Sequence, residues 1–306
     1  MSVETGQAAP TRPPITAGKV ARSLRAFSLP ITVLPVLVSA AATAPPARWR
    51  WGVLLASVVG AALFHLAGNL FNDYFDFRGN VDRRTHDDDQ RPGRLLVFGQ
   101  LLPRDILTEA IICLLLAAAA TAYLTWQCGP VILAFAAAAA AGGYAYTGPP
   151  FKLKYRALGE PAIFIIFGPL LVIGAAYAQV GHIVASAAWL SVPIGLATTA
   201  ILTGNSFRDC EEDAQAGIWT LGRFAGGKVA RGVYLLLVLC AAGGLMVMGF
   251  TGRGPLPLAA APITLLLLGK PLKAALRGTR LPNIDALTAR WETVLLAGVL
   301  LSYLLA

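Results

Sequence analysis

Charged residues are scarce in this chain of 306 residues, at 13% of the sequence, whereas hydrophobic residues make up 56%. Soluble domains have about 25% charged residues, so this balance excludes the two soluble domains that the length alone would allow. The apolar residues come in blocks of about 20, the length that crosses roughly 30 Å of hydrocarbon, and short charged stretches separate them. We therefore expect a single polytopic membrane domain.

The chain also lacks the cysteine patterns of a metal or redox centre. Its four cysteines, Cys113, Cys128, Cys210 and Cys240, are widely spaced, and no pair has the Cys-x-x-Cys spacing of a zinc or dithiol site. We interpret them as small buried hydrophobic residues or inert thiols.

The start of this sequence also lacks the pattern of a secretory signal peptide. The first residues are rich in Pro, Thr, Ala and Gly, and they contain neither an apolar core nor a convincing cleavage site. We expect residues 1–20 to form a disordered N-terminal tail and residues 21–306 to form one transmembrane domain. The first apolar block is then a retained membrane helix.

Hydrophobic patterning predicts an all-α fold, a polytopic helical bundle of about nine transmembrane helices. The eighth segment is the weakest, because it is short and interrupted by prolines. The predicted segments are residues 25–45, 51–71, 105–126, 129–147, 160–180, 186–206, 230–250, 255–270 and 289–306.

The basic residues gather at one side of the predicted membrane. With the N-terminus in the cytoplasm, 22 of the 25 Lys and Arg residues fall on the cytoplasmic side, and only Arg48, Arg50 and Arg253 fall outside. The net charge of +9 is thus explained by membrane topology, and a nucleic-acid partner is not expected. We expect an integral protein of the plasma membrane, with the lipid bilayer as its surroundings.

Two acidic clusters lie on the same predicted side as the basic residues. Asn69, Asn72, Asp73 and Asp76 end the second segment at spacings of three and four, which places them on one helical face. Asn205, Asp209 and Asp213 repeat this arrangement at the end of the sixth segment. Two such helix ends on one membrane side can converge.

Carboxylate and carboxamide oxygens of this kind suit Mg²⁺, which uses one or two carboxylates and takes further ligands from phosphates and water. The alternative is that these acids are solvated loop residues paired with Arg78, Arg83 or Arg208. For residues 87–89, three consecutive aspartates without helical spacing to the rest, the solvated loop is the favoured interpretation.

The connection between the fourth and fifth segments carries Lys152, Lys154 and Arg156, close in sequence to Tyr146 and Tyr155. Fixed cations suit the charge of a diphosphate. Positive-inside sorting alone would also place cations here, and composition does not separate the two explanations.

These residues resemble the UbiA superfamily of intramembrane prenyltransferases, from about residue 20 to the end. The likeness rests on three stretches: Asn72-Asp73-x-x-Asp76 with Asp82 beyond it, Asn205-x-x-x-Asp209-x-x-x-Asp213, and residues 146–150 (Tyr-Thr-Gly-Pro-Pro) running to Leu-Gly-Glu at 158–160. In that family a helical bundle encloses a central cavity, and Mg²⁺ ions held by the two acidic motifs bind a prenyl diphosphate.

The resemblance implies roles for individual residues of this chain. The implied magnesium and catalytic residues are Asp73, Asp76, Asp209 and Asp213. Lys154 and Tyr146 match the loop that the family places over the diphosphate. The implied substrate-binding residues are Asn72, Asn205, Lys152, Arg208 and Asp82.

Within the superfamily, residues 204–221 and the Phe-Gly-Pro at 167–169 look most like the menaquinone branch, whose members prenylate 1,4-dihydroxy-2-naphthoate. Ser206 stands where a second Asn is common and Glu160 where Asp is common, so a 4-hydroxybenzoate-type acceptor is the alternative. We expect polyprenyl transfer from a prenyl diphosphate to the aromatic acceptor.

Two rival functions are less compatible with the sequence. A membrane phosphotransferase would carry an Asp-Gly-x-x-Ala-Arg run, which is absent. An ion-coupled transporter would place ionisable residues at mid-membrane in several segments, often with internal repeats. His65, one turn before Asn69, is expected to be packed or hydrogen-bonded, or else to line the cavity.

Overall fold

The structure is a computed structural model, and it describes residues 14–79, 81 and 95–306. All regular secondary-structure elements in this part of the chain are helices. The elements are α1 (Ala17–Leu24), η1 (Ala26–Ser28), α2 (Pro30–Thr43), η2 (Pro46–Arg48), α3 (Trp51–Arg78), α4 (Pro103–Cys128), α5 (Val131–Thr147), η3 (Leu153–Tyr155), α6 (Gly159–Ile165), η4 (Ile166–Ile173), α7 (Gly174–Val180), α8 (Ala185–Arg208), α9 (Cys210–Ala216), α10 (Leu221–Ala225), α11 (Gly227–Phe250), η5 (Leu256–Leu268), α12 (Gly269–Arg277) and α13 (Ile284–Leu304). The predicted boundary at residue 20 falls within α1, and most of the predicted tail lies outside the described residues.

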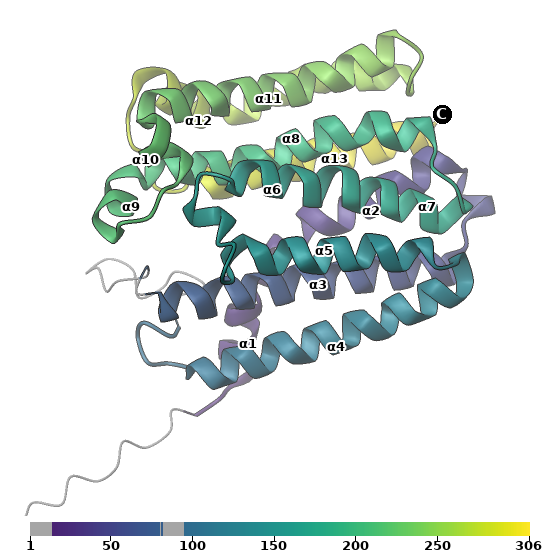
Figure 1. Cartoon of the computed structure of the whole chain (residues 1–306). Helices are drawn as coiled ribbons and strands as arrows, with labels where there is room; N and C mark the ends of the chain where they lie inside the picture. The colour runs from purple at the N-terminus through teal and green to yellow at the C-terminus, as the bar shows by residue number, and fades with distance from the viewer. Residues whose placement is uncertain (1–13, 80, 82–94) are drawn as a thin grey trace, which may run out of the picture.

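The long helices run side by side as a bundle (Figure 1). Helix α3 packs against α4, while α8 packs against α11 and η4, and α13 lies between α2, α8 and η5. The largest buried cluster joins α8, α11 and α13 and includes Leu190, Tyr234 and Trp291. Outward-facing apolar side chains such as Trp126 (79% exposed) and Leu266 (81%) fit contact with lipid.

Six helical segments of the described chain are long and apolar enough to span a membrane, or seven if the bent pair Ala17–Ser28 and Pro30–Thr43 is one span. The predicted all-helical membrane bundle is confirmed, but the count of nine is not. The remaining two predicted segments are also helices, α5 with 17 residues and α13 with 21. The eighth predicted segment, the weakest of the nine, is helical: η5 continues into α12, and together they form a candidate span of 22 residues.

One span contains a π-helical stretch. Helices α6, η4 and α7 form the continuous segment Gly159–Val180, and Pro169 lies inside the π-helical part. Proline has no N–H to donate to the helical ladder, and a wider π-turn accommodates this interruption.

Beside Pro169 the span approaches α8 so closely that only glycine fits. A Cβ on Gly168 would lie 2.6 Å from the Ser191 carbonyl oxygen, and one on Gly195 would lie 3.0 Å from the Gly168 Cα. Two glycines thus let the backbones of η4 and α8 touch, as in other closely packed membrane helices. This contact fixes one wall of the central cavity.

We expect Gly168→Ala to lower the stability of the bundle by about 1–3 kcal/mol, because the added methyl group overpacks a backbone contact. The matched control is Gly298→Ala in α13, where a Cβ meets nothing within 4 Å. The apparent melting temperature in detergent should fall for Gly168→Ala and stay level or rise for the control. Equal melting temperatures would contradict the close contact.

Candidate active site

The first acidic motif lies on the last two turns of α3. The helix continues unbroken to Arg78, as the sequence predicted, so that Asn72, Asp73 and Asp76 project near one another. Asp73 is 2% exposed and Asp76 is 5% exposed. Both carboxylates therefore need partners within the protein.

The second acidic motif spans a break between helices. Helix α8 ends at Arg208, Asp209 lies between the helices, and α9 begins at Cys210. The main chain keeps its four-residue spacing through the break, because the Asp209 amide donates to the Asn205 carbonyl (2.8 Å) and the Asp213 amide to the Asp209 carbonyl (2.8 Å). The three residues still open onto one cavity.

The two motifs meet at a cavity of about 760 Å³. The motif residues that line it are Asn69, Asn72, Asp76, Asn205, Asp209 and Asp213. Tyr146, Lys154 and Arg208, for which the family resemblance implied roles at the site, line the cavity too. Asp73 does not line this cavity, Lys152 lines a different cavity, and Asp82 lies outside the described residues.

A basic side chain pairs with each of three motif carboxylates, and for Asp73 and Asp76 that side chain comes from another part of the chain. Lys154 Nζ lies 2.7 Å from Asp76 Oδ2 and donates to Asn72 Oδ1 at 3.1 Å. The Tyr155 hydroxyl also donates to Asp76. These contacts fasten the η3 loop over the end of α3.

Arg208 makes a two-pronged contact with Asp209, with its Nε and Nη2 atoms each 2.6 Å from a carboxylate oxygen. Its Nη1 lies 3.0 Å from Asp285 Oδ1 on α13. Arg208 therefore joins α8 to α13 at the end of the cavity. The planar guanidinium suits this double pairing.

Arg25 pairs with Asp73, and the sequence analysis missed it. It lies between α1 and η1 with a φ of 53° and lines the cavity. Its partner is 48 residues away in the sequence. Local spacing carries no signal for such a pair.

His65 supports the segment that carries Arg25. It hydrogen-bonds with Ser28 Oγ (3.2 Å) and Thr32 Oγ1, and Phe167 contacts its ring edge to face at 5.4 Å. Because the Ser28 hydroxyl donates to the Arg25 carbonyl (2.8 Å), we assign the Nε2 proton of His65 as the donor to Ser28 and Nδ1 as the acceptor from Thr32. His65 is thus hydrogen-bonded and also lines the cavity.

The two loops over the site also bind each other. The Trp219 amide donates to the Tyr155 carbonyl (3.2 Å) and the Ala157 amide donates to the Trp219 carbonyl (2.6 Å). Thr220 Oγ1 in turn donates to Asp213 Oδ2 (2.6 Å). The loop with Lys154 and the loop after the second motif therefore form one cover.

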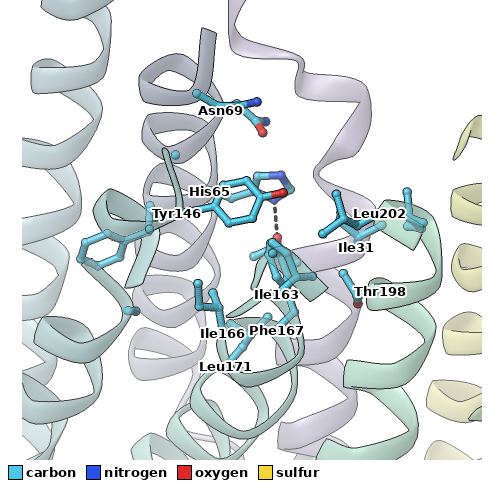
Figure 2. Close-up of a pocket in the computed structure, with 18 of the residues that line it drawn as sticks. Ile31, His65, Asn69, Tyr146, Ile163, Ile166, Phe167, Leu171, Thr198 and Leu202 are labelled. Carbon is cyan, nitrogen blue, oxygen red and sulfur yellow. Dashed lines mark hydrogen bonds between the residues drawn. The ribbon is translucent and has the colours of Figure 1, made fainter. Parts of the chain in front are cut away.

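Away from the motifs the cavity wall is apolar. Figure 2 shows Asn69 at one end of the view, then His65 and Tyr146, and then the aliphatic and aromatic wall of Ile163, Ile166, Phe167 and Leu171. Ile31 and Leu202 lie on a further side. The cavity therefore has a charged end and a hydrocarbon-lined interior, which suits a ligand with an anionic head and an apolar tail.

The charged end fits a magnesium–diphosphate group. No cluster of three or more His, Cys, Asp or Glu side chains among the described residues could hold a metal ion alone. Mg²⁺ needs only one or two carboxylates when phosphates and water supply the rest, and each motif offers that. Asn205 Oδ1 is buried without a hydrogen-bond partner, and it is an oxygen ligand of the right kind.

A membrane bundle with two Asn/Asp helix ends and an apolar cavity defines the class of protein. Residues 32–299 match the model of the UbiA prenyltransferase family, so the chain belongs to that family, as the sequence motifs suggested.

Two kinds of curated relative match this chain. The chain is 35% identical to UbiA prenyltransferase domain-containing protein 1 of Gallus gallus over 71% of this chain, and the match spans 64% of that protein's length. It is 32% identical to the 1,4-dihydroxy-2-naphthoate octaprenyltransferase of Mycobacterium leprae, over 85% of this chain and 87% of the relative.

A solved structure has the same fold. A UbiA homologue from Archaeoglobus fulgidus bound to GPP and Mg²⁺ superposes with a TM-score of 0.65 over 94% of this chain and all of the other, at 14% identity.

We expect Arg25→Gln to lower stability by about 2 kcal/mol in the absence of metal, because it removes the Arg25 cation from the buried Asp73 carboxylate. Mg²⁺ with inorganic diphosphate should restore much of the loss. The measurement is the apparent melting temperature with and without these ions. Lys19→Gln, which removes a half-buried cation of α1 whose Nζ atom donates to the Pro14 carbonyl, is the control. An Arg25 variant that melts with the wild type would refute the role of the pair.

Proposed function

We propose that the protein is a magnesium-dependent prenyltransferase that moves a polyprenyl group from a prenyl diphosphate to an aromatic acceptor. The observation that carries the proposal is the single cavity in which two Asn/Asp motifs and three cations, Arg25, Lys154 and Arg208, meet an apolar interior. Family membership and the prenyl diphosphate named for the Archaeoglobus neighbour support it.

The chain's own residues suit the departure of a diphosphate. Lys154 and Arg25 are held by carboxylates at the charged end, where they can bind phosphate oxygens as charge develops. Asp76, Asp209 and Asp213 are the proposed metal ligands at the cavity surface, and Asp73 is the fourth, behind Arg25. When bound, magnesium supplies charge neutralisation of the leaving diphosphate.

The interior wall suits the prenyl chain and the carbocation character that forms at its allylic carbon. Ile163, Ile166 and Leu171 offer no nucleophile and exclude water, which would quench a cation. Burial of the tail contributes about 0.8 kcal/mol for each methylene. The electron-rich ring carbon of the acceptor forms a bond to the allylic carbon, whose bond to diphosphate breaks. The ring becomes aromatic again by releasing a proton or, where the acceptor loses its carboxylate, carbon dioxide, and we assign no general base.

The proposed acceptor is 1,4-dihydroxy-2-naphthoate, as named for the mycobacterial relatives, in menaquinone biosynthesis. Because the animal relatives match with similar identity and their printed name specifies no acceptor, a 4-hydroxybenzoate-type acceptor is the second candidate. We place the active site and the N-terminus on the cytoplasmic side of the plasma membrane, since most cations lie at that end.

The test is an assay of purified protein in detergent with Mg²⁺, geranyl or farnesyl diphosphate and either acceptor, with product and diphosphate measured. We expect prenylated naphthol without its carboxylate, and a loss of roughly 100-fold or more in Asp73→Ala and Asp209→Ala. Glu211→Gln, an exposed acid in the same stretch as the second motif, is the control and should keep activity.

Product from 4-hydroxybenzoate alone would keep the reaction class and change the acceptor. The absence of diphosphate release with every acceptor would reject the prenyltransferase proposal.

A further inference from the structure

The chain between the second acidic motif and α13 contains cations but no acids. From residue 214 to residue 284 the sequence has eight Lys and Arg residues and no Asp or Glu. Five of these cations lie on two elements that contact each other, the start of α11 and α12. These five residues are termed the basic patch: Lys228 and Arg231 on α11, and Lys270, Lys273 and Arg277 on α12.

Helix α12 lies at the level where the bilayer meets water. The 13 residues of η5 precede it in the same candidate span, and at a rise of about 2 Å each they cover about 26 Å of the roughly 30 Å of hydrocarbon. Figure 1 shows α12 at the end of the bundle where α9 and α10 also lie. Lys270, Lys273 and Arg277 recur at intervals of three and four and are exposed, while Ala274 and Ala275 are buried. One face of α12 is therefore basic.

Arg231 brings the two parts of the patch together. A Cβ on Gly278, the residue that follows α12, would lie 2.6 Å from Arg231 Nη1. Gly278 has a φ of 72°, so glycine both ends the helix and lets the guanidinium lie against its backbone. Lys228 precedes Arg231 by three residues and shares its helical face. The cations of α11 thus lie beside the end of α12 that carries Arg277.

The patch has no counter-charge in the part of the chain that the structure describes. None of its five cations forms an ion pair there, whereas Arg25, Lys154 and Arg208 each bind a carboxylate. The positive-inside rule accounts for cations at this end of the bundle, but it does not exclude acids among them. Because like charges repel, a patch without acids is stabilised by an anion that comes from outside the chain.

Large apolar side chains are exposed on the same elements. Leu276 of α12 is 73% exposed, Phe224 of α10 is 68% exposed and Val229 of α11 is 49% exposed. A soluble anion would leave these side chains in water. A lipid offers a phosphate to the cations and acyl chains to the apolar side chains, so it matches both properties of the surface.

We propose that the basic patch binds the headgroups of anionic phospholipids at the bilayer surface. Each Lys or Arg close to an anionic membrane surface contributes about fivefold to the binding constant. None of the five cations lines the central cavity, so this site is separate from the candidate active site. The proposed binding does not depend on the proposed function.

The chain leads directly from the patch to the central cavity. Shortly after Gly278, the residues Pro282, Asn283 and Asp285 line that cavity. Arg208 Nη1 donates to the Pro282 carbonyl (3.0 Å) and lies 3.0 Å from Asp285 Oδ1. A lipid bound to α12 would therefore steady the segment that positions Arg208 beside the second motif.

The test measures lipid binding to the full-length protein in neutral detergent by native mass spectrometry, with phosphatidylglycerol and phosphatidylcholine of equal acyl chains as probes. We expect the wild type to bind phosphatidylglycerol about 100-fold more tightly than phosphatidylcholine, and the triple variant Lys270→Gln, Lys273→Gln, Arg277→Gln to lose most of this preference. Arg104→Gln, the control, removes an exposed cation at the start of α4, where Asp105 is adjacent, and should keep the preference.

Melting temperatures in detergent without lipid check the fold of each variant, and we expect them to be equal because the substituted side chains are exposed. Equal binding of the two lipids by the wild type, or full phosphatidylglycerol binding by the triple variant, would overturn the lipid site and leave the cations to membrane topology. Displacement of the lipid by soluble polyglutamate or inorganic phosphate at equal charge would assign the patch to soluble anions instead.

Turnover in vesicles tests the link to the cavity, and this part rests on the proposed function. With phosphatidylglycerol in place of phosphatidylcholine, we expect prenyl transfer to rise severalfold in the wild type and to stay level in the triple variant. Patch-dependent lipid binding without any prenylated product would reject the proposed function and keep the lipid site. Equal turnover of the wild type in both lipids would keep the function and contradict the link between the patch and the cavity.

Discussion

The pairing of carboxylates with basic side chains, two of which come from distant segments, organises the charged end of this bundle. Asp73 holds Arg25 of the N-terminal segment, Asp76 holds Lys154 of the η3 loop, and Asp209 holds Arg208. An unpaired carboxylate as buried as Asp73 or Asp76 is costly, so these two pairs fix the positions of the elements that supply the cations. The N-terminal segment, α3 and the η3 loop converge on one space for this reason, while Arg208 joins the end of α8 to α13 through Asp285.

The same pairs suit the proposed chemistry. A diphosphate with magnesium brings both signs of charge, and it can exchange contacts with a site whose acids and cations are already balanced. The hydrocarbon-lined interior begins immediately beyond them, at Ile163 and Ile166, so the polar head and the apolar tail of a prenyl diphosphate have separate regions. The close glycine contact between η4 and α8 gives this interior one of its rigid walls.

The sequence predicted the parts of the site that follow local helical spacing. The continuation of α3 through Asp76 and the shared orientation of Asn205, Asp209 and Asp213 were read from intervals of three and four residues. The break at Asp209 was not foreseen, because no proline marks it and the four-residue hydrogen bonds persist. Hydropathy could not give the number of spans either. Helix α5 is short, and the chain bends by 47° between Ala17–Ser28 and Pro30–Thr43.

Long-range partners could not be predicted. Arg25 reaches Asp73 only because the chain turns between α1 and η1, and that turn has no strong sequence signal. The separate destinations of Lys152 and Lys154 depend on the path of a loop held by Trp219. Apolar residues that line the cavity have the same composition as those that face lipid, so the cavity itself was expected from family resemblance alone.

The central claim is that the two motifs form one metal–diphosphate site, and its most direct test is Mn²⁺ binding followed by electron paramagnetic resonance. With geranyl thiodiphosphate present, the account predicts tight Mn²⁺ binding that is lost in Asp76→Asn and equally in Asp209→Asn. Full Mn²⁺ binding by either variant would show that one motif suffices, and would contradict a site shared between the two helix ends.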